Sequence, residues 1–159
     1  MEENVMIKNG SFNAGTSGYE IFVDTSADAN YVVDSLSEDN AMDFTILDTG
    51  ASDWNVQLKQ NNITLEKGKT YTLTFEAKSD MKRDIRVIIQ GREDKGWPVY
   101  SGENIVTLSS DYQTFSTTFT MESDTDPDAF LSVCLGAVSE RIDSRHRVCI
   151  DNISLEEVN

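Results

Sequence analysis

Residues 69–77 constrain the fold most, because their apolar and polar side chains alternate with a period of two. Tyr71, Leu73 and Phe75 share one face of this segment, whereas three threonines and Glu76 share the other. Such alternation is typical of a β-strand that buries one face and leaves the other in water. The segment therefore predicts a strand in a sheet that packs against a core on one side.

Other runs rich in β-branched and aromatic residues predict further strands. They cover residues 85–90, 112–121, 130–135 and 147–155. Turn residues separate them, among them Glu66–Gly68, Gly91–Gly96 and the segment around Pro127. The apolar pattern is weaker before Asn40, and we expect residues 24–40 to contain a long surface loop.

Short strands at regular spacing, with no convincing amphipathic helix, indicate an all-β fold. The expected architecture is an antiparallel β-sandwich of the jelly-roll type. A length of 159 residues suits one folding unit, and no repeat, linker or low-complexity tract divides it. We therefore expect a single domain over residues 1–159.

The charge of the chain excludes several classes of partner. There are 13 Lys and Arg residues against 28 Asp and Glu residues, which gives a net charge of −15. A protein that binds nucleic acid through its phosphates needs an excess of cations, and anionic membranes or acidic polysaccharides would be repelled. No apolar run is long enough to cross a bilayer. We expect a monomer with no nucleic-acid or membrane partner, whereas neutral ligands remain open.

The chain start and the cysteines say little about the compartment. Residues 1–4 carry no basic residue, and no apolar run follows them, so we expect no signal peptide. The chain is then either cytosolic or a mature module from a longer secreted protein. Cys134 and Cys149 form neither a disulfide framework nor a zinc pattern. Both alternate with inward-facing apolar neighbours, so we predict outward-pointing, free thiols.

Catalysis is not expected. The only histidine, His146, lies between two arginines that oppose its protonation, and it is interpreted as a solvated residue at the start of the last strand. Most acidic residues lie in polar loops such as residues 37–39 and 122–128, where we expect solvation and no pair of carboxyl groups facing each other across a cleft. No glycine-rich loop suited to phosphate is present.

The segment 85–90 indicates a binding surface instead. Its alternation places three aliphatic side chains toward the core: Ile85, Val87 and Ile89. The other face then carries Arg86, Ile88 and Gln90. A guanidinium, an aliphatic group and an amide in one row are unusual for a plain solvated surface and typical of the floor of a polar-ligand site.

Aromatic rings near such a floor would complete a sugar site, because sugars stack their C–H faces on aromatic rings. The candidates are Trp54, Trp97 and Tyr100. Core packing is the alternative role for each ring. This alternative is weaker for Trp97, which lies among charged residues in the loop 91–98.

Motifs spread along nearly the whole chain resemble one known family. They are Asn9–Phe12 with Gly18–Tyr19, Trp54–Gln57, Leu65–Leu73 with Ala77–Lys78, Tyr112–Met121, Leu135–Gly136 and Cys149–Leu155. In this order and spacing the chain resembles the family 4 carbohydrate-binding modules and their relatives in families 9, 16 and 22. These are noncatalytic jelly rolls attached to secreted polysaccharide-degrading enzymes. The resemblance implies a concave sheet that forms a cleft for one glycan chain.

The resemblance also implies stacking residues. Trp54 falls where related modules place a sugar-stacking aromatic residue. Tyr100 lies near a second stacking position, and Phe22 lies near another, although it lacks a hydroxyl group. Trp97 is a possible third platform on the rim.

Polar positions of the cleft follow from the same resemblance. Gln57 falls where relatives place a hydrogen-bonding side chain, and Arg86 and Gln90 fall on the cleft strand. Asn55 could join them. Cys134 occupies a position where relatives often carry Gln or His, and a thiol is a poor donor.

Related modules often hold a structural calcium ion that ties the N-terminal segment to the last strand. The matching positions here are Ser11, Asn40 and Asp151, and oxygen ligands with one carboxylate suit this cation. The alternative role for Asp151 is to cap turn amides. Some relatives also bridge the position of Cys149 to that of Asp43, and this bridge cannot form here.

The expected function is noncatalytic binding of single chains of soluble or amorphous β-glucan, β-1,4-linked, in an open cleft. Outside the cell, the module would then direct an attached glycoside hydrolase to this polysaccharide. One alternative is a xylan- or mannan-binding module of the same superfamily. The other is a structural β-sandwich that binds no sugar.

Overall fold

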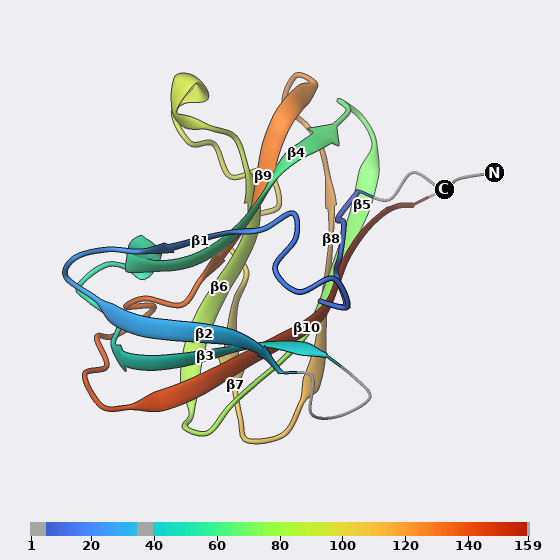
Figure 1. Ribbon diagram of the computed structural model, residues 1–159. Coiled ribbons are helices and arrows are strands. Elements are labelled where there is room, and N and C mark those ends of the chain that lie inside the picture. The colour runs from blue at the N-terminus through green and yellow to red at the C-terminus, as the bar shows by residue number, and fades with distance from the viewer. Residues whose placement is uncertain (1–5, 35–39, 159) are drawn as a thin grey trace.

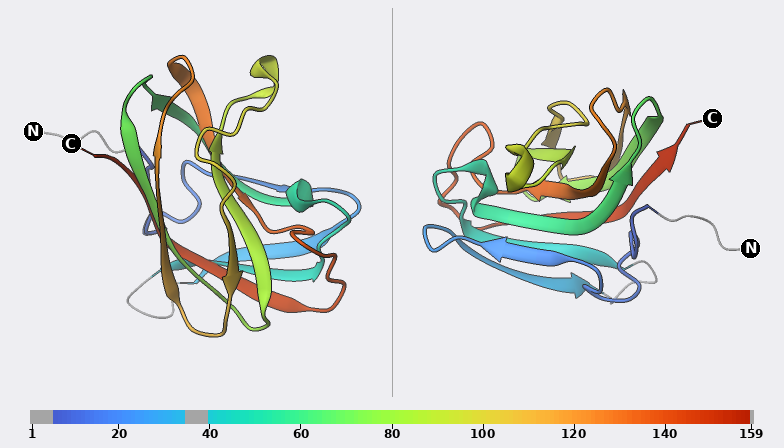
Figure 2. Two further views of the ribbon diagram at one scale, coloured as in Figure 1. Left: turned by 180° about the vertical axis from the view of Figure 1, so that it is seen from behind. Right: turned by 90° about the horizontal axis from the view of Figure 1, so that it is seen from above.

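The computed structural model describes residues 6–34 and 40–158. In this part of the chain, ten strands form two antiparallel sheets of five strands each, stacked as two layers (Figures 1 and 2). The all-β antiparallel sandwich is thereby confirmed. The expectations about residues 1–4 and 37–39 concern segments outside the described residues. Within the described ranges, no helix combines the length and apolar character needed to cross a membrane.

Each sheet draws its strands from both halves of the chain. Sheet A contains, in spatial order, β1 (Glu20–Val23), β4 (Val56–Leu65), β9 (Asp126–Cys134), β6 (Arg83–Gln90) and β7 (Ile105–Leu108). Sheet B contains β2 (Asp28–Asp34), β3 (Ala41–Asp48), β10 (His146–Glu157), β5 (Thr70–Ser79) and β8 (Gln113–Thr120). Two short 3-10 helices, η1 (Asp53–Asn55) and η2 (Glu93–Lys95), precede β4 and follow β6.

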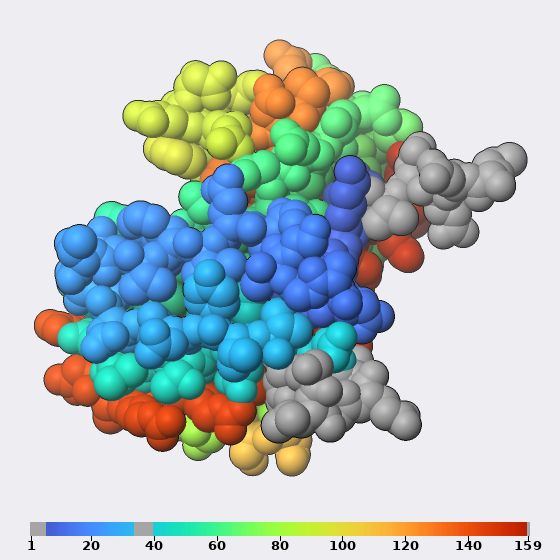
Figure 3. All heavy atoms as spheres, in the orientation of Figure 1, coloured from blue at the N-terminus to red at the C-terminus, as the bar shows by residue number. Residues whose placement is uncertain are grey.

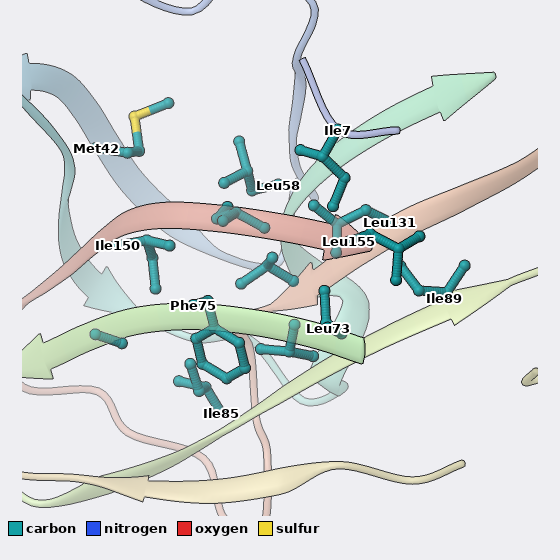
Figure 4. Packing of buried hydrophobic residues seen from close by; sticks show 14 of the residues in the cluster. Ile7, Met42, Leu58, Leu73, Phe75, Ile85, Ile89, Leu131, Ile150 and Leu155 are labelled. Carbon is teal, nitrogen blue, oxygen red and sulfur yellow. The ribbon is translucent and has the colours of Figure 1, made fainter. Parts of the chain in front are cut away.

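The core fills the space between the sheets with aliphatic and aromatic side chains from both layers (Figure 4). On β5, Tyr71, Leu73 and Phe75 are buried there, as their alternation predicts. The opposite face of β5 is solvated, and its threonines share hydrogen bonds with threonine and serine hydroxyls of β8, for example Thr72 with Thr118 at 2.9 Å. Such pairs stabilise the pairing of β5 with β8 on the solvated face, while the other face of β5 buries its apolar side chains in the core.

The five predicted strands correspond to β5, β6, β8, β9 and β10. The predicted loop over residues 24–40 is wrong in part, because Asp28–Asp34 forms β2. This strand lies at the edge of sheet B and pairs only with β3 among the described strands. Its Tyr31 and Val32 are exposed. An edge strand buries little of either face, so its sequence lacks the alternation that marked the other strands.

His146 differs from its predicted environment. Instead of being solvated, it is 2 % exposed, and its Nε2 lies 2.9 Å from Nη1 of the buried Arg83. Arginine can only donate, so Nε2 accepts, and Nδ1 then donates to the carbonyl oxygen of Ser144 at 2.9 Å. The ring is held as the neutral tautomer that joins the two sheets.

The cysteine predictions are confirmed. Both thiols are free, and they point outward from different sheets, Cys134 from β9 and Cys149 from β10. Neither belongs to the core cluster between the layers.

Candidate functional site

The outer face of sheet A brings side chains from five strands into one row. Strand pairing places Phe22 opposite Gln57, Gln57 opposite Cys134, Cys134 opposite Arg86, and Arg86 opposite Ile105. Residues in register on neighbouring strands point to the same face of a sheet. The row therefore contains four of the candidate sugar-binding residues, drawn from segments that are far apart in the sequence.

Alternation along β6 holds as predicted. Ile85, Val87 and Ile89 belong to the core cluster, whereas Ile88 does not. Arg86, Ile88 and Gln90 therefore share the outer face, and Gln90 lies in register with Phe130 of β9. Arg86 pairs with Cys134, and Gln90 pairs with Phe130 four residues further along β6. These two pairs are therefore about 13 Å apart along the strand direction.

An exposed tryptophan lies at one end of this face. Trp54 belongs to η1, and 48 % of its surface is exposed. Its ring is stacked near that of Phe22, with centroids 6.1 Å apart and an interplanar angle of 29°. Trp54 and Arg86 line the same depression of about 490 Å³, which also touches Glu103, Ile105 and the segment 137–139. An apolar ring and a guanidinium thus face one shallow cavity.

The Arg86 guanidinium is held in place by acids. Its Nε and Nη2 donate to the two carboxylate oxygens of Glu103 at 2.6 and 2.7 Å, and Nη1 approaches Asp53 at 3.5 Å. The hydrogen bonds and charge of this bidentate pair raise the pKa of Arg86 and lower the pKa of Glu103. The net charge of this cluster is negative, so it offers no attraction to an anionic ligand.

The other end of the face carries Trp97, which follows η2. Trp97 meets Phe130 edge to face, with centroids 6.1 Å apart, and the Arg92 guanidinium lies 5.7 Å above the Phe130 ring. These residues, with Lys59, Asn61, Glu93 and Asp94, line a second depression of about 570 Å³. In Figure 3 the yellow segment after β6 projects beside a recess above the blue β1.

The floor between the two ends is polar and tightly bonded. Nε2 of Gln57 donates to the Ser132 hydroxyl at 2.5 Å, and this hydroxyl lies 3.3 Å from Sγ of Cys134. Cys134 is only 1 % exposed, and its burial raises the pKa of the thiol. A neutral, covered thiol offers little hydrogen bonding to a ligand. Gln57, with its amide group, is therefore the neutral hydrogen-bonding side chain of this row.

Two predicted site residues lie away from the floor. Asn55 is buried within the η1 turn, where its Oδ1 accepts from the backbone N–H of Ser52 at 2.8 Å. Tyr100 packs against the core, and its hydroxyl donates to Oδ2 of Asp126 at 2.7 Å. Their polar groups are engaged in holding loops.

The three candidate calcium positions lie on or beside segments that are neighbours in the structure. Asp151 follows Ile150, which pairs with Met42, so Asn40 before β3 lies beside it. Ser11 follows Gly10, whose carbonyl accepts from Ile153 N at 3.0 Å. Asp151 is buried, and its Oδ1 accepts from the N–H of Asn152 at 2.8 Å. One carboxylate with amide and backbone oxygens fits a hard cation such as calcium.

Several residues of this face escaped the sequence analysis. They are Lys59, Asn61, Ile105, Glu103, Phe130 and Ser132. Phe130 and Ser132 had a signal, because they alternate with the core residues Ala129, Leu131 and Val133. Glu103 had none, because it reaches Arg86 from a loop.

Comparisons with known proteins bear on this surface. Residues 4–141 match a family of carbohydrate binding domains that joins families 4 and 9. A solved family 4 module is 30% identical and has a TM-score of 0.79, with 96% of this chain and 99% of that chain covered. The N-terminal cellulose-binding domain of Cellulomonas fimi β-1,4-glucanase C shares the fold at 19% identity, with a TM-score of 0.70 and coverage of 96% and 97%.

A longer protein also matches in part. A cellulose 1,4-beta-cellobiosidase of Acetivibrio thermocellus is 43% identical over 51 residues. This match spans 31% of the present chain and 6% of that enzyme. With the match over residues 4–141 and the shared sandwich, the chain belongs to the family of carbohydrate binding domains that joins families 4 and 9, and it is a noncatalytic module.

Proposed function

We propose that the outer face of sheet A binds single chains of a neutral β-glucan, with β-1,4-linked glucan as the main ligand. The observation that carries this proposal is the exposed Trp54, stacked near Phe22 beside the polar row of Gln57 and Arg86. An exposed ring beside planar hydrogen-bonding groups suits the C–H face and hydroxyls of a sugar. The cellulose-binding domain of Cellulomonas fimi with the same fold supports the choice of glucan.

Charge favours a neutral chain over an acidic one. The protein carries a net charge of −15, and the Arg86 guanidinium is neutralised by Glu103. An approaching uronic acid or sulfate would meet a repulsive field with no uncompensated cation in the Trp54 depression. Binding would therefore depend on stacking and hydrogen bonds.

The module would act as part of a larger enzyme outside the cell. The partial match to a cellobiosidase supports attachment to a glycoside hydrolase that acts on the same polymer. Holding the polymer close raises its local concentration for the attached catalytic domain. We further propose that Ser11, Asn40 and Asp151 hold a calcium ion that ties residues 10–13 to β10.

The test is electrophoresis of the isolated module through gels that contain barley β-glucan, hydroxyethylcellulose, xylan or galactomannan. We expect retardation in the two glucan gels. Retardation only in xylan or galactomannan would assign a different polymer to the face. No retardation in any gel would favour a structural sandwich without sugar binding.

Trp54→Ala tests the stacking assignment directly. The variant should lose on the order of 1–4 kcal/mol of binding free energy, which abolishes visible retardation. Tyr31→Ala is the matched control, because Tyr31 is an equally exposed aromatic residue on the edge of sheet B. The assignment is wrong if Trp54→Ala binds as the parent does while its thermal unfolding is unchanged.

A further inference from the structure

The loop of residues 91–98, which follows β6, presents Trp97 in an unfavourable backbone conformation. The bridge between Gln90 and Val99 lies at the base of this loop. Gly91 N–H donates to Pro98 O at 2.8 Å, which closes the loop at its base. Trp97 has a φ of 58°, and its side chain is 52 % exposed. A bulky residue at positive φ is strained and persists only where the surroundings hold it. Within the loop, the N–H of Trp97 donates to the carbonyl oxygen of Arg92 at 3.1 Å.

A buried carboxylate at the start of β9 ties down the segments on both sides of Trp97. Asp126 is 1 % exposed, and Oδ2 accepts from the Tyr100 hydroxyl at 2.7 Å. Its Oδ1 accepts from Lys95 Nζ at 3.3 Å and from the N–H of Asp128 at 2.8 Å. Lys95 and Tyr100 lie on either side of Trp97 in the sequence, so both arms of the loop are tied to one anchor.

The base of the loop is packed tightly under the same tyrosine. A Cβ atom at Gly91 would lie 2.8 Å from the Tyr100 hydroxyl and 2.8 Å from Pro98. Real Cβ atoms essentially never approach other atoms so closely, so a larger residue at position 91 would require Tyr100 or Pro98 to shift. The Tyr100 hydroxyl therefore lies between its acceptor, Asp126, and the base of the loop at Gly91.

We infer that Tyr100, Lys95 and Asp126 form a latch that fixes the Trp97 loop as a preformed wall of the sugar-binding face. Tyr100 is then a positioning residue that acts through Trp97 and not a stacking platform. The sugar-binding part of this inference rests on the proposed function, whereas the latch itself does not. A preformed wall avoids the entropy loss that ordering a mobile loop would add to binding.

The latch can be tested without a ligand, because the chain has only two tryptophans. Trp54→Phe leaves Trp97 as the only fluorescent indole. In this background, Tyr100→Phe and Asp126→Asn should increase acrylamide quenching of Trp97 and lower its fluorescence anisotropy. Tyr31→Phe removes a tyrosine hydroxyl from sheet B and should change neither. Unchanged quenching and anisotropy in both latch variants would overturn the inference.

A double-mutant cycle with a glucan oligosaccharide tests how Tyr100 acts. In the parent chain, Tyr100→Phe should weaken binding by about tenfold, which is near the lower end of what one hydrogen bond to a charged group contributes. In a Trp97→Ala background, the same change should have almost no effect, because the residue to be positioned is gone. An equal loss in both backgrounds would show that Tyr100 contacts the sugar itself and would overturn the positioning role.

These readouts separate the two proposals. If the parent binds no oligosaccharide, the proposed function fails, and the fluorescence of Trp97 still decides whether the latch exists. If the parent binds and the latch variants leave Trp97 fluorescence unchanged, the latch fails alone. Circular dichroism and thermal unfolding of each variant confirm that the sandwich is folded.

Discussion

At the scale of single residues, His146 shows how burial sets a titration. Removal of the imidazole from water is the main cause that lowers its pKa below the ordinary 6.5, and the Arg83 charge lowers it further. The Ser144 carbonyl and Asp80 act in the opposite direction but do not cancel this. The neutral ring accepts from Arg83, so a proton on Nε2 would place two cations face to face.

This pKa shift predicts a loss of stability in mild acid. As the pH falls below 6.5, the unfolded chain takes up the proton before the folded chain does, so the free energy of unfolding decreases. The decrease should continue down to the lowered pKa of the folded state. Urea unfolding measured between pH 7.5 and pH 5.5 checks this. The decrease should be smaller in His146→Gln, and equal slopes in both proteins would contradict the assignment.

At the scale of elements, the junction between η1 and the end of β9 positions Trp54. Gly136 N–H donates to Asp53 O at 2.9 Å, and Ala137 N–H donates to Ser52 O at 3.0 Å. A Cβ atom at Gly136 would lie 2.3 Å from the Ser52 carbonyl oxygen, which is backbone and cannot rotate away. The turn that carries Trp54 can therefore lie against β9 only because residue 136 has no side chain.

Gly136→Ala should thus destabilise the fold by roughly 1–3 kcal/mol and weaken glucan retardation more than a matched glycine change does. Gly68→Ala is the control, since Gly68 has open space around its Cβ position and a φ of 88°. It should lose about 1 kcal/mol from backbone strain alone and leave retardation unchanged. Urea unfolding and affinity electrophoresis of both variants measure the difference. Equal retardation of the two variants would show that η1 does not depend on this contact.

At the scale of the whole molecule, the proposed calcium ion would join the N-terminal segment to β10 and β3. No group of three or more His, Cys, Asp or Glu side chains that could hold a metal occurs among the described residues, so backbone and amide oxygens would have to complete the site. A ligand that binds only the folded state stabilises it in proportion to the logarithm of its concentration. The thermal midpoint should therefore depend on free calcium.

With free calcium at about 100 times Kd, the stabilisation is about 2.7 kcal/mol, which raises Tm by roughly 5–10 °C for a domain of this size. Differential scanning calorimetry with calcium and with EDTA measures this difference. Asp151→Asn should abolish it, whereas Asp111→Asn, at an exposed position, should not. Identical Tm values for the parent in calcium and in EDTA would refute the site.

For each strand with clear apolar–polar alternation, the sequence alone determined which face points to the core, because the alternation of side chains is a local property of the extended backbone. It thereby placed Ile85 inward and Arg86 outward, and both thiols outside the core. Only the tertiary structure decided which strands are neighbours, and so it alone brought Gln57, Cys134 and Arg86 into one row. It also decided that the Tyr100 hydroxyl meets Asp126. Strand pairing and loop contacts depend on how the whole chain packs, and no local pattern encodes them.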